Sequence, residues 1–364
     1  MNHTVELLEK IEKSFREGTL TQEQIPFDAI REAVSTEIGL NRNTFQREQY
    51  ECVVTRWNKI CDDFVASRAD KTKLLLFLDA AILCIHMISE LMKTLANGDY
   101  WRYKYRQKAD DPEIAEIIEY IDRKKKIQLL NYDFTEKYQP DNVEVLYDAE
   151  SAMSYVIYKE RKMYFPRGWD RDKIADYFCS VVMEQDLYSP HCYYKSGYEV
   201  KEGDVVLDAG AAEGIFCFDV MDRAEQIILV EADPQWVEAL RKSFEGETSK
   251  VIIVQGYLSD RNEGEYISID GLMEGKTLNY IKMDIEGYEK IALTGAERTL
   301  QKNEKICCAI CSYHCKEDEE WIKKFLNEQG MNTDTSRGYI CPDWIPEEYI
   351  NAELRRGIVF GRKG

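Results

Sequence analysis

The sequence lacks a long uncharged apolar run and a secretory leader. Its most apolar stretch, residues 74–88, contains Asp79 and His86 and is shorter than the roughly 20 residues that a membrane-spanning helix needs. Residues 1–15 have the apolar spacing of an amphipathic helix, without the apolar segment and cleavage site of a signal peptide. We therefore expect no membrane span and a cytoplasmic protein.

Basic residues are too few to balance the acidic ones. The chain has 48 Lys and Arg against 67 Asp and Glu, a formal net charge of −19. A field of that sign repels nucleic-acid phosphates and anionic lipid headgroups. The expected partner is therefore a small molecule or a glycan, and neither a nucleic acid nor a membrane.

The cysteines also lack the even number and regular spacing of a disulfide framework. The 11 cysteines are an odd number scattered through the chain, which favours reduced thiols over a disulfide framework. Cys307, Cys308, Cys311 and Cys315 cluster beside His314, but most of them fall in an apolar strand, where successive side chains point to opposite faces. Buried thiols are favoured there over a zinc site.

The chain is too long for one ordinary domain, and three regions differ in periodicity. Residues 1–140 are predicted to form a helical N-terminal region of unknown role, whose amphipathic helices could pair between chains in a homo-oligomer. Residues 141–197 are predicted to form a β-hairpin, a helix and a loop near the active site. In residues 198–364 apolar strands alternate with helices, which predicts an α/β, Rossmann-like domain with a doubly wound, mostly parallel sheet.

The first strand of that domain, VVLDAG at residues 205–210, leads into a turn with Asp208, Gly210 and Gly214. Glu231 ends the second strand about 20 residues later, where nucleotide-binding domains place a ribose-binding carboxylate. The turn lacks the GxGxxG of hydride-transfer domains, which disfavours NAD. Acidic Asp208 suits S-adenosylmethionine instead, because the amino-acid portion of this cofactor carries an ammonium group.

Several strings resemble the motifs of the FkbM family of S-adenosylmethionine-dependent methyltransferases. They are VVLDAGAAEGIF, LVEADP, VQGYLSD and, most specifically, IKMDIEGYEKIALTGA. The resemblance covers residues 198–364 and implies a class I methyltransferase domain that transfers a methyl group to a hydroxyl of a carbohydrate or related small metabolite. Ala212 departs from the glycine that many methyltransferases carry. The residues that the resemblance assigns to cofactor binding are Asp208, Gly210, Ala211, Gly214, Glu231, Ala232, Leu258, Ser259 and Asp284.

The catalytic candidates follow neighbouring strands of the predicted sheet. Asp284 ends the fourth strand and His314 the fifth, so both side chains are expected at the same crevice. A hydroxyl needs a base to become nucleophilic, and we predict His314 as that base, Asp284 as the group that orients it or the hydroxyl, and Glu286 at the mouth of the site. His191 and Tyr193 are weaker candidates for the lining of the substrate site.

Three alternatives to this interpretation of the site and of the function stay open. Asp284, Glu286 and His314 could hold a divalent ion, which is less favoured than the base. The acceptor could instead be a protein or a nucleic acid, although the chain has no NPPY-like string after the fourth strand. A third possibility is a catalytically inactive cofactor-binding module whose N-terminal helices bind a partner.

Overall fold

The computed structural model describes residues 98–342 and 353–364, together with scattered positions before residue 98. The chain divides into two compact units, residues 1–131 with 341–354 and residues 132–340 with 355–364. Most of the predicted N-terminal helical region, including nearly all of residues 74–88, lies outside the described part. Within the described part, no helix combines the length and apolarity needed to cross a bilayer.

The described portion of the first unit contains the helices α5 (Gly98–Lys104) and α6 (Pro112–Lys124) and the short 3-10 helix η3 (Arg106–Lys108). α6 begins as its sequence predicts, because the Asp111 side chain accepts a hydrogen bond from the Glu113 N–H at 3.0 Å and a proline follows it. The isoleucines of α6 repeat at three and four positions and are buried. The helix ends where Lys125 adopts a left-handed φ of 52°.

The second unit starts with two 3-10 helices, η4 (Asp133–Lys137) and η5 (Pro140–Asn142), and a small antiparallel sheet. Its strands are β1 (Leu146–Asp148), β2 (Met153–Tyr158) and β3 (Arg161–Tyr164). The predicted hairpin corresponds to β2 and β3, and β1 adds a third strand. The helix α7 (Arg171–Glu184) follows, and the Asp170 side chain accepts a hydrogen bond from the Lys173 N–H at its start.

A seven-stranded sheet forms the centre of this unit, in the order β11-β12-β10-β9-β4-β5-β6. Its strands, in chain order, are β4 (Val205–Ala209), β5 (Gln226–Glu231), β6 (Val251–Gln255), β9 (Tyr280–Met283), β10 (Ile306–Cys311), β11 (Asn332–Thr335) and β12 (Ile358–Lys363), and a separate pair is β7 (Tyr257–Ser259) with β8 (Tyr266–Ser268). The connecting helices are α8 (Ile215–Val220), α9 (Pro234–Ser243), η6 (Glu245–Glu247), α10 (Ile269–Leu272), α11 (Glu289–Thr294), α12 (Glu297–Lys302) and α13 (Asp318–Glu328).

The five central strands are parallel, while β12 runs antiparallel to both β10 and β11. The order of the other strands is that of a Rossmann sheet, and β12 is inserted between the fifth and sixth of them. This arrangement is the class I methyltransferase fold, so the predicted α/β architecture is confirmed. Within this seven-stranded sheet, β11 is the strand that the sequence did not indicate, and the separate pair β7 and β8 was not predicted either.

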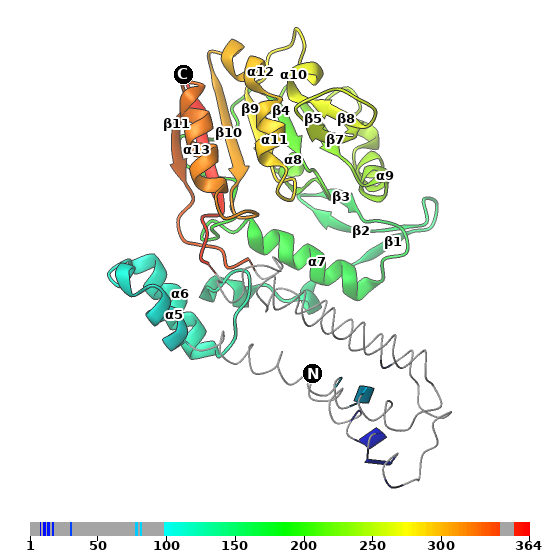
Figure 1. Cartoon of the computed structure of the whole chain (residues 1–364). Coiled ribbons are helices and arrows are strands. Elements are labelled where there is room, and N and C mark those ends of the chain that lie inside the picture. Colours follow the sequence, from blue (N-terminus) through cyan, green and yellow to red (C-terminus); the bar gives the residue numbers. More distant parts are fainter. Residues whose placement is uncertain are drawn as a thin grey trace. The chain divides into compact units, whose positions relative to one another are not determined.

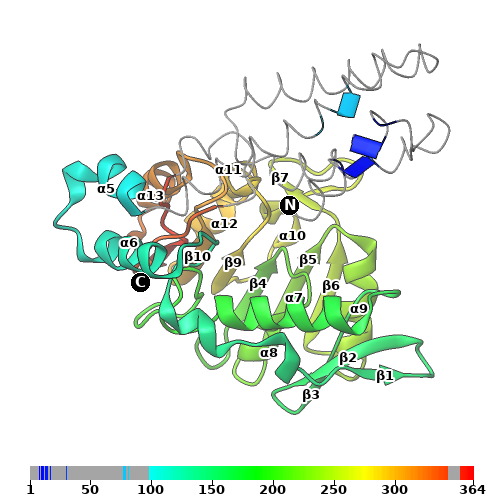
Figure 2. The ribbon, with the colours of Figure 1, turned by 90° about the horizontal axis from the view of Figure 1, so that it is seen from below.

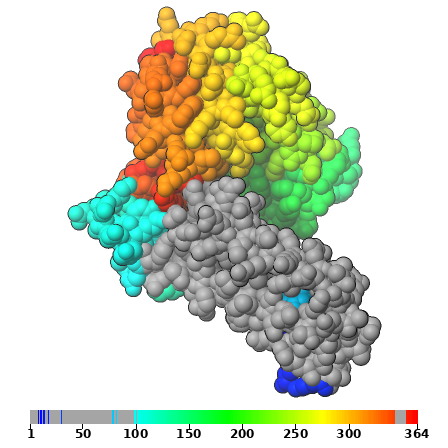
Figure 3. Space-filling model, in the orientation of Figure 1, coloured from blue at the N-terminus to red at the C-terminus, as the bar shows by residue number. Residues whose placement is uncertain are grey.

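The core of the sheet consists of apolar strand residues that are buried on both faces, such as Leu207, Ile228 and Ile281. Figure 2 shows α11 and α12 on one side of the sheet and α8 on the other. Figure 1 shows α7 beyond the arrowhead of β10, at the carboxyl edge of the parallel strands. The yellow and orange segments that follow β6 form a continuous surface of this unit (Figure 3).

Candidate functional site

The turn between β4 and α8 is held in a conformation that needs small residues. Gly210, Ala212 and Gly214 have φ angles of 73°, 43° and 82°, all in the left-handed region. A Cβ on Gly210 would lie 1.8 Å from the carbonyl oxygen of Asp284. A glycine at 210 therefore lets the ends of β4 and β9 approach each other, and Ala212 adopts the left-handed backbone that glycine usually provides.

A buried ion pair lies beneath this turn. Lys282 Nζ is 3.1 Å from Asp208 Oδ1 and donates a hydrogen bond of 2.6 Å to the Gly210 carbonyl. Burial alone would lower the pKa of Lys282, but the carboxylates of Asp208 and Asp284 raise it above its usual value. Asp208 is fully buried and engaged by Lys282, so its predicted contact with the amino-acid end of a cofactor stays a prediction.

Glu231 is fixed at the end of β5 by three backbone N–H groups. Its Oε2 accepts from Ala212 at 2.9 Å, and its Oε1 accepts from Ala232 at 2.8 Å and from Asp233 at 2.9 Å. The side chain is only partly buried, and carboxylate oxygens have further lone pairs. The remaining acceptor sites of this carboxylate therefore suit the two hydroxyls of a ribose.

The other predicted cofactor residues lie in or beside this region. Ala211 is buried in the glycine turn, and Ala232 follows Glu231 and is partly exposed. Leu258 and Ser259 belong to β7, which continues from the end of β6, and both are buried. Their contacts with an adenine stay a prediction.

Asp284, which follows β9, is the hub of a polar cluster. The Tyr193 hydroxyl donates to its Oδ2 at 2.8 Å, and His191 Nε2 lies 3.4 Å from the same oxygen. His314 Nε2 lies 3.5 Å from Oδ1. Burial on its own would raise the pKa of Asp284, but the hydrogen bond from His191 and the charges of His191, His314 and Lys282 hold it well below its usual range.

His314 follows β10, and acids face both of its ring nitrogens. Nδ1 lies 3.1 Å from Glu289 Oε1, while Nε2 lies 3.5 Å from both Asp284 Oδ1 and Glu286 Oε2. Burial alone would lower the pKa of His314, but the close carboxylate of Glu289 and the charges of Asp284 and Glu286 raise it to about 9. The imidazole is therefore protonated at neutral pH in this structure.

The loop after α7 brings His191 and Tyr193 to Asp284, and both side chains are buried. The Tyr313 hydroxyl is 3.0 Å from His191 Nε2, and Glu184 Oε2 is 3.9 Å from His191 Nδ1. Burial raises the pKa of Glu184 to about 7 although His191 opposes the shift. The two weakly predicted residues are thus next to the catalytic candidates, in a packed cluster.

Three members of this cluster were not predicted from the sequence: Glu184, Glu289 and Tyr313. Glu289 stands in the quoted string IKMDIEGYEKIALTGA, where it resembles an ordinary acidic residue in the first turn of a helix. Glu184 is seven positions after Tyr177, so the two share one face of α7, and Tyr177 donates to Glu213 of the glycine turn at 2.8 Å. That spacing is the only sequence signal that points α7 toward the site.

Two groups of side chains have donor atoms close enough together to bind a metal ion. Asp284, Glu289 and His314 form one group, and His191, Asp284 and Cys311 form the other, with one ligand atom of each residue within 4.8 Å of the others. Of the clustered cysteines, Cys307, Cys308 and Cys311 are buried free thiols, as predicted, whereas Cys315 is exposed.

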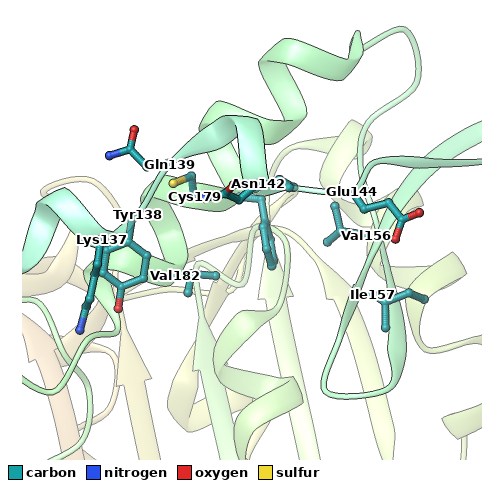
Figure 4. A pocket seen from close by; sticks show the side chains of 11 residues that line it. Lys137, Tyr138, Gln139, Asn142, Glu144, Val156, Ile157, Cys179 and Val182 are labelled. Atoms are coloured by element: carbon teal, nitrogen blue, oxygen red, sulfur yellow. The ribbon is translucent and has the colours of Figure 1, made fainter.

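A surface pocket of about 370 Å³ lies between α7, β2 and the segment around η4 and η5 (Figure 4). Lys137, Tyr138 and Glu144 give it polar groups, and valines from β2 and α7 are among its apolar lining residues. None of the predicted site residues lines this pocket. It is therefore distinct from the cluster around Asp284.

Comparison with known families identifies one match. Residues 239–340 match the model of the methyltransferase FkbM domain. This stretch contains Asp284, Glu289 and His314, while the glycine turn and Glu231 precede it. A comparison with curated proteins gave no match.

Solved structures with a similar fold include several methyltransferases. The methyltransferase FkbM of Methylobacillus flagellatus KT is 14% identical, with a TM-score of 0.37, over 69% of this chain and 62% of that one. The precorrin-6y C5,15-methyltransferase of Geobacter metallireducens GS-15 is 11% identical, with a TM-score of 0.33, over 46% of this chain and 84% of that one. TYW2 of M. jannaschii in complex with AdoMet is 12% identical, with a TM-score of 0.33, over 60% and 89%. The chain spans less than two thirds of the length of the first of these proteins.

Proposed function

Because the chain carries a methyltransferase FkbM domain in a class I methyltransferase fold, we propose that it is an S-adenosylmethionine-dependent O-methyltransferase. The acceptor is a hydroxyl of a carbohydrate or a related small metabolite. The observation that carries the proposal is the meeting of His314 and Asp284 at the carboxyl edge of the sheet, next to the turn at Gly210.

The cofactor site is formed by the glycine turn and the ends of β4 and β5. Glu231 would accept hydrogen bonds from the ribose hydroxyls, and the turn at Gly210 and Gly214 would lie along the amino-acid portion. When bound, S-adenosylmethionine supplies a methyl group on a positively charged sulfur. The protein has to place the acceptor in line with that methyl group and remove the proton of the hydroxyl.

His314 is the base in this proposal, and Asp284 orients it. A base with a pKa of about 9 accepts a proton strongly, but only about 1% of it is deprotonated at pH 7. We therefore expect kcat/KM to rise about tenfold per pH unit from pH 7 and to level off above pH 9. A rate that is independent of pH in this range would contradict the assignment of His314 as the base.

The first test is binding of the reaction product. Calorimetry with S-adenosylhomocysteine should detect binding by the unmodified protein, and the absence of binding would refute the cofactor proposal. The second test is transfer of a labelled methyl group from S-adenosylmethionine to neutral sugars and polyols, with hydroxyl-blocked analogues as controls. Labelling of the blocked analogues would refute O-methylation.

The third test replaces the proposed base. His314→Gln should lower kcat/KM by about 10²- to 10⁴-fold at pH 9 and abolish its rise with pH, because no group of similar pKa remains at that place. Glu297→Gln alters an exposed acid on the neighbouring helix α12 and serves as the control. Treatment with EDTA should leave the rate unchanged, whereas a loss that Mn²⁺ or Mg²⁺ restores would favour the divalent-ion alternative.

A further inference from the structure

The imidazole of His314 is enclosed by acids that differ in burial. The Glu289 side chain is 1% exposed and meets Nδ1, while the Glu286 side chain is 81% exposed and meets Nε2. The loop between β9 and α11 supplies Glu286 as well as Asp284, and Glu289 is the first residue of α11. Gly287 bends this loop with a φ of 93°, and a Cβ there would lie 3.7 Å from the Cβ of His314. The loop therefore wraps around the imidazole.

Glu289 is held rigidly where it meets the ring. It is the first residue of α11, and its Oε1 accepts the Ile285 N–H at 2.9 Å in addition to facing His314 Nδ1. Its Oε2 is buried without a hydrogen-bond partner. A buried carboxylate can only accept hydrogen bonds while it is ionised, so the imidazole nitrogen that faces it is the one that keeps a proton.

We propose that Glu289 is a positioning residue that holds the neutral His314 in the tautomer with its proton on Nδ1, so that Nε2 is the nitrogen that takes the proton of the acceptor hydroxyl. The proposal rests on the proposed function, because it assigns a role within the same site. In the reaction, the hydroxyl O–H bond breaks as its proton passes to Nε2, the oxygen bonds to the methyl carbon, and the carbon–sulfur bond breaks with its electron pair left on sulfur. The resulting imidazolium then releases the Nε2 proton toward the exposed Glu286 and solvent.

A metal ion is the alternative for the same three side chains, because one ligand atom each of Asp284, Glu289 and His314 lies within 4.8 Å of the others. Here Glu289 lies 3.1 Å from Nδ1, whereas the Asp284 contact is made by Nε2 on the opposite edge of the ring. The pattern of an acid, an imidazole and a reactive nitrogen is the one that orients a histidine base in hydrolases.

The test reads the tautomer directly by ¹⁵N NMR of histidine-labelled full-length protein. The sequence has only four histidines, and the spectrum of His314→Gln assigns the signal of His314. Recorded from pH 7 to 10.5 without cofactor, the wild-type signal should change from that of the imidazolium to that of the neutral ring, and above about pH 9 the neutral ring should carry its proton on Nδ1. A neutral ring with its proton on Nε2 would overturn the proposal even if the protein methylates hydroxyls.

Variants then link the tautomer to the rate. Glu289→Gln keeps the size of the side chain but removes its charge. The ratio of the Nδ1–H tautomer to the Nε2–H tautomer of neutral His314 should then fall at least about tenfold, and the pKa of His314 should drop. kcat should decrease by about 10²- to 10⁴-fold. Glu289→Asp, which keeps the charge, should restore part of the Nδ1–H signal and of the rate. Glu286→Gln is the matched control for the tautomer and should leave the proton on Nδ1.

These outcomes separate two kinds of failure. The expected tautomer in a protein that methylates no hydroxyl would leave the role of Glu289 as a holder of the ring intact and refute the proposed function. A Glu289→Gln variant with unchanged tautomer and unchanged kcat would overturn the positioning role. The wild-type spectrum decides the tautomer by itself, so the test also holds if a variant is unstable.

Discussion

Substitution of Gly210 by alanine tests the close approach of the β4 turn to β9. The left-handed backbone costs an alanine about 1–2 kcal/mol, part of which is offset because alanine also restricts the unfolded chain. In addition, the new Cβ would lie 1.8 Å from the Asp284 carbonyl oxygen, whereas ordinary contacts start at 3.4 Å, so the two backbones must separate by about 1.6 Å. Such overpacking costs about 1–3 kcal/mol more. We expect Gly210→Ala to lower the free energy of unfolding by about 2–4 kcal/mol.

Gly203→Ala is the matched control for this prediction. Gly203 has a φ of 81° but nothing within 4 Å of the position of a Cβ, so its substitution should cost only the backbone part, about 1 kcal/mol. Urea unfolding followed by tryptophan fluorescence measures both variants, and calorimetry with S-adenosylhomocysteine measures their binding. Gly210→Ala should also weaken binding, because the turn has to move. Equal losses of stability in the two variants would refute the close approach of the two strand ends.

Three further predictions concern buried or fixed charges. Lys282→Met leaves the buried carboxylate of Asp208 without its cation and should lower the free energy of unfolding by about 3–5 kcal/mol. Adding Asp208→Asn should recover part of this loss. A Lys282→Met variant as stable as the unmodified protein would contradict the buried ion pair. Glu231→Gln should weaken S-adenosylhomocysteine binding about 10- to 100-fold in calorimetry, whereas Glu225→Ala, at an exposed position, should not change it. Because the pKa of His314 is raised in the folded protein, its protonation stabilises the fold fully below about pH 6.5, and this contribution should disappear as the pH rises to about 9. The free energy of unfolding of His314→Gln in urea should lack this part of the pH dependence.

The sequence allowed the central sheet to be predicted because its parallel strands are buried on both faces and therefore read as continuous apolar runs. β11 has the sequence NTDT, which contains no apolar run, and it was therefore missed. It is an edge strand that pairs with β12 alone, two of its four residues are exposed, and none of them is apolar. The antiparallel direction of β12 also depends on pairing, which a single apolar run does not encode.

The site was predictable where a residue follows a strand. Asp284 and His314 came from neighbouring strand ends, and the structure places them 3.5 Å apart. Glu289 could not be chosen in this way, because an acid in the first turn of a helix has an ordinary capping role and only the tertiary structure buries it against His314. The raised pKa of His314 likewise depends on distances to three acids, which the sequence does not contain.

The loop after α7 and the imidazole of His314 share one carboxylate, that of Asp284. Tyr193 and His191 both bind Oδ2 of Asp284, and the other oxygen of the same carboxylate faces His314. An acceptor that displaced this loop would take two donors from Asp284, so more of its negative charge would act on His314. A displacement of this loop would therefore raise the basicity of His314.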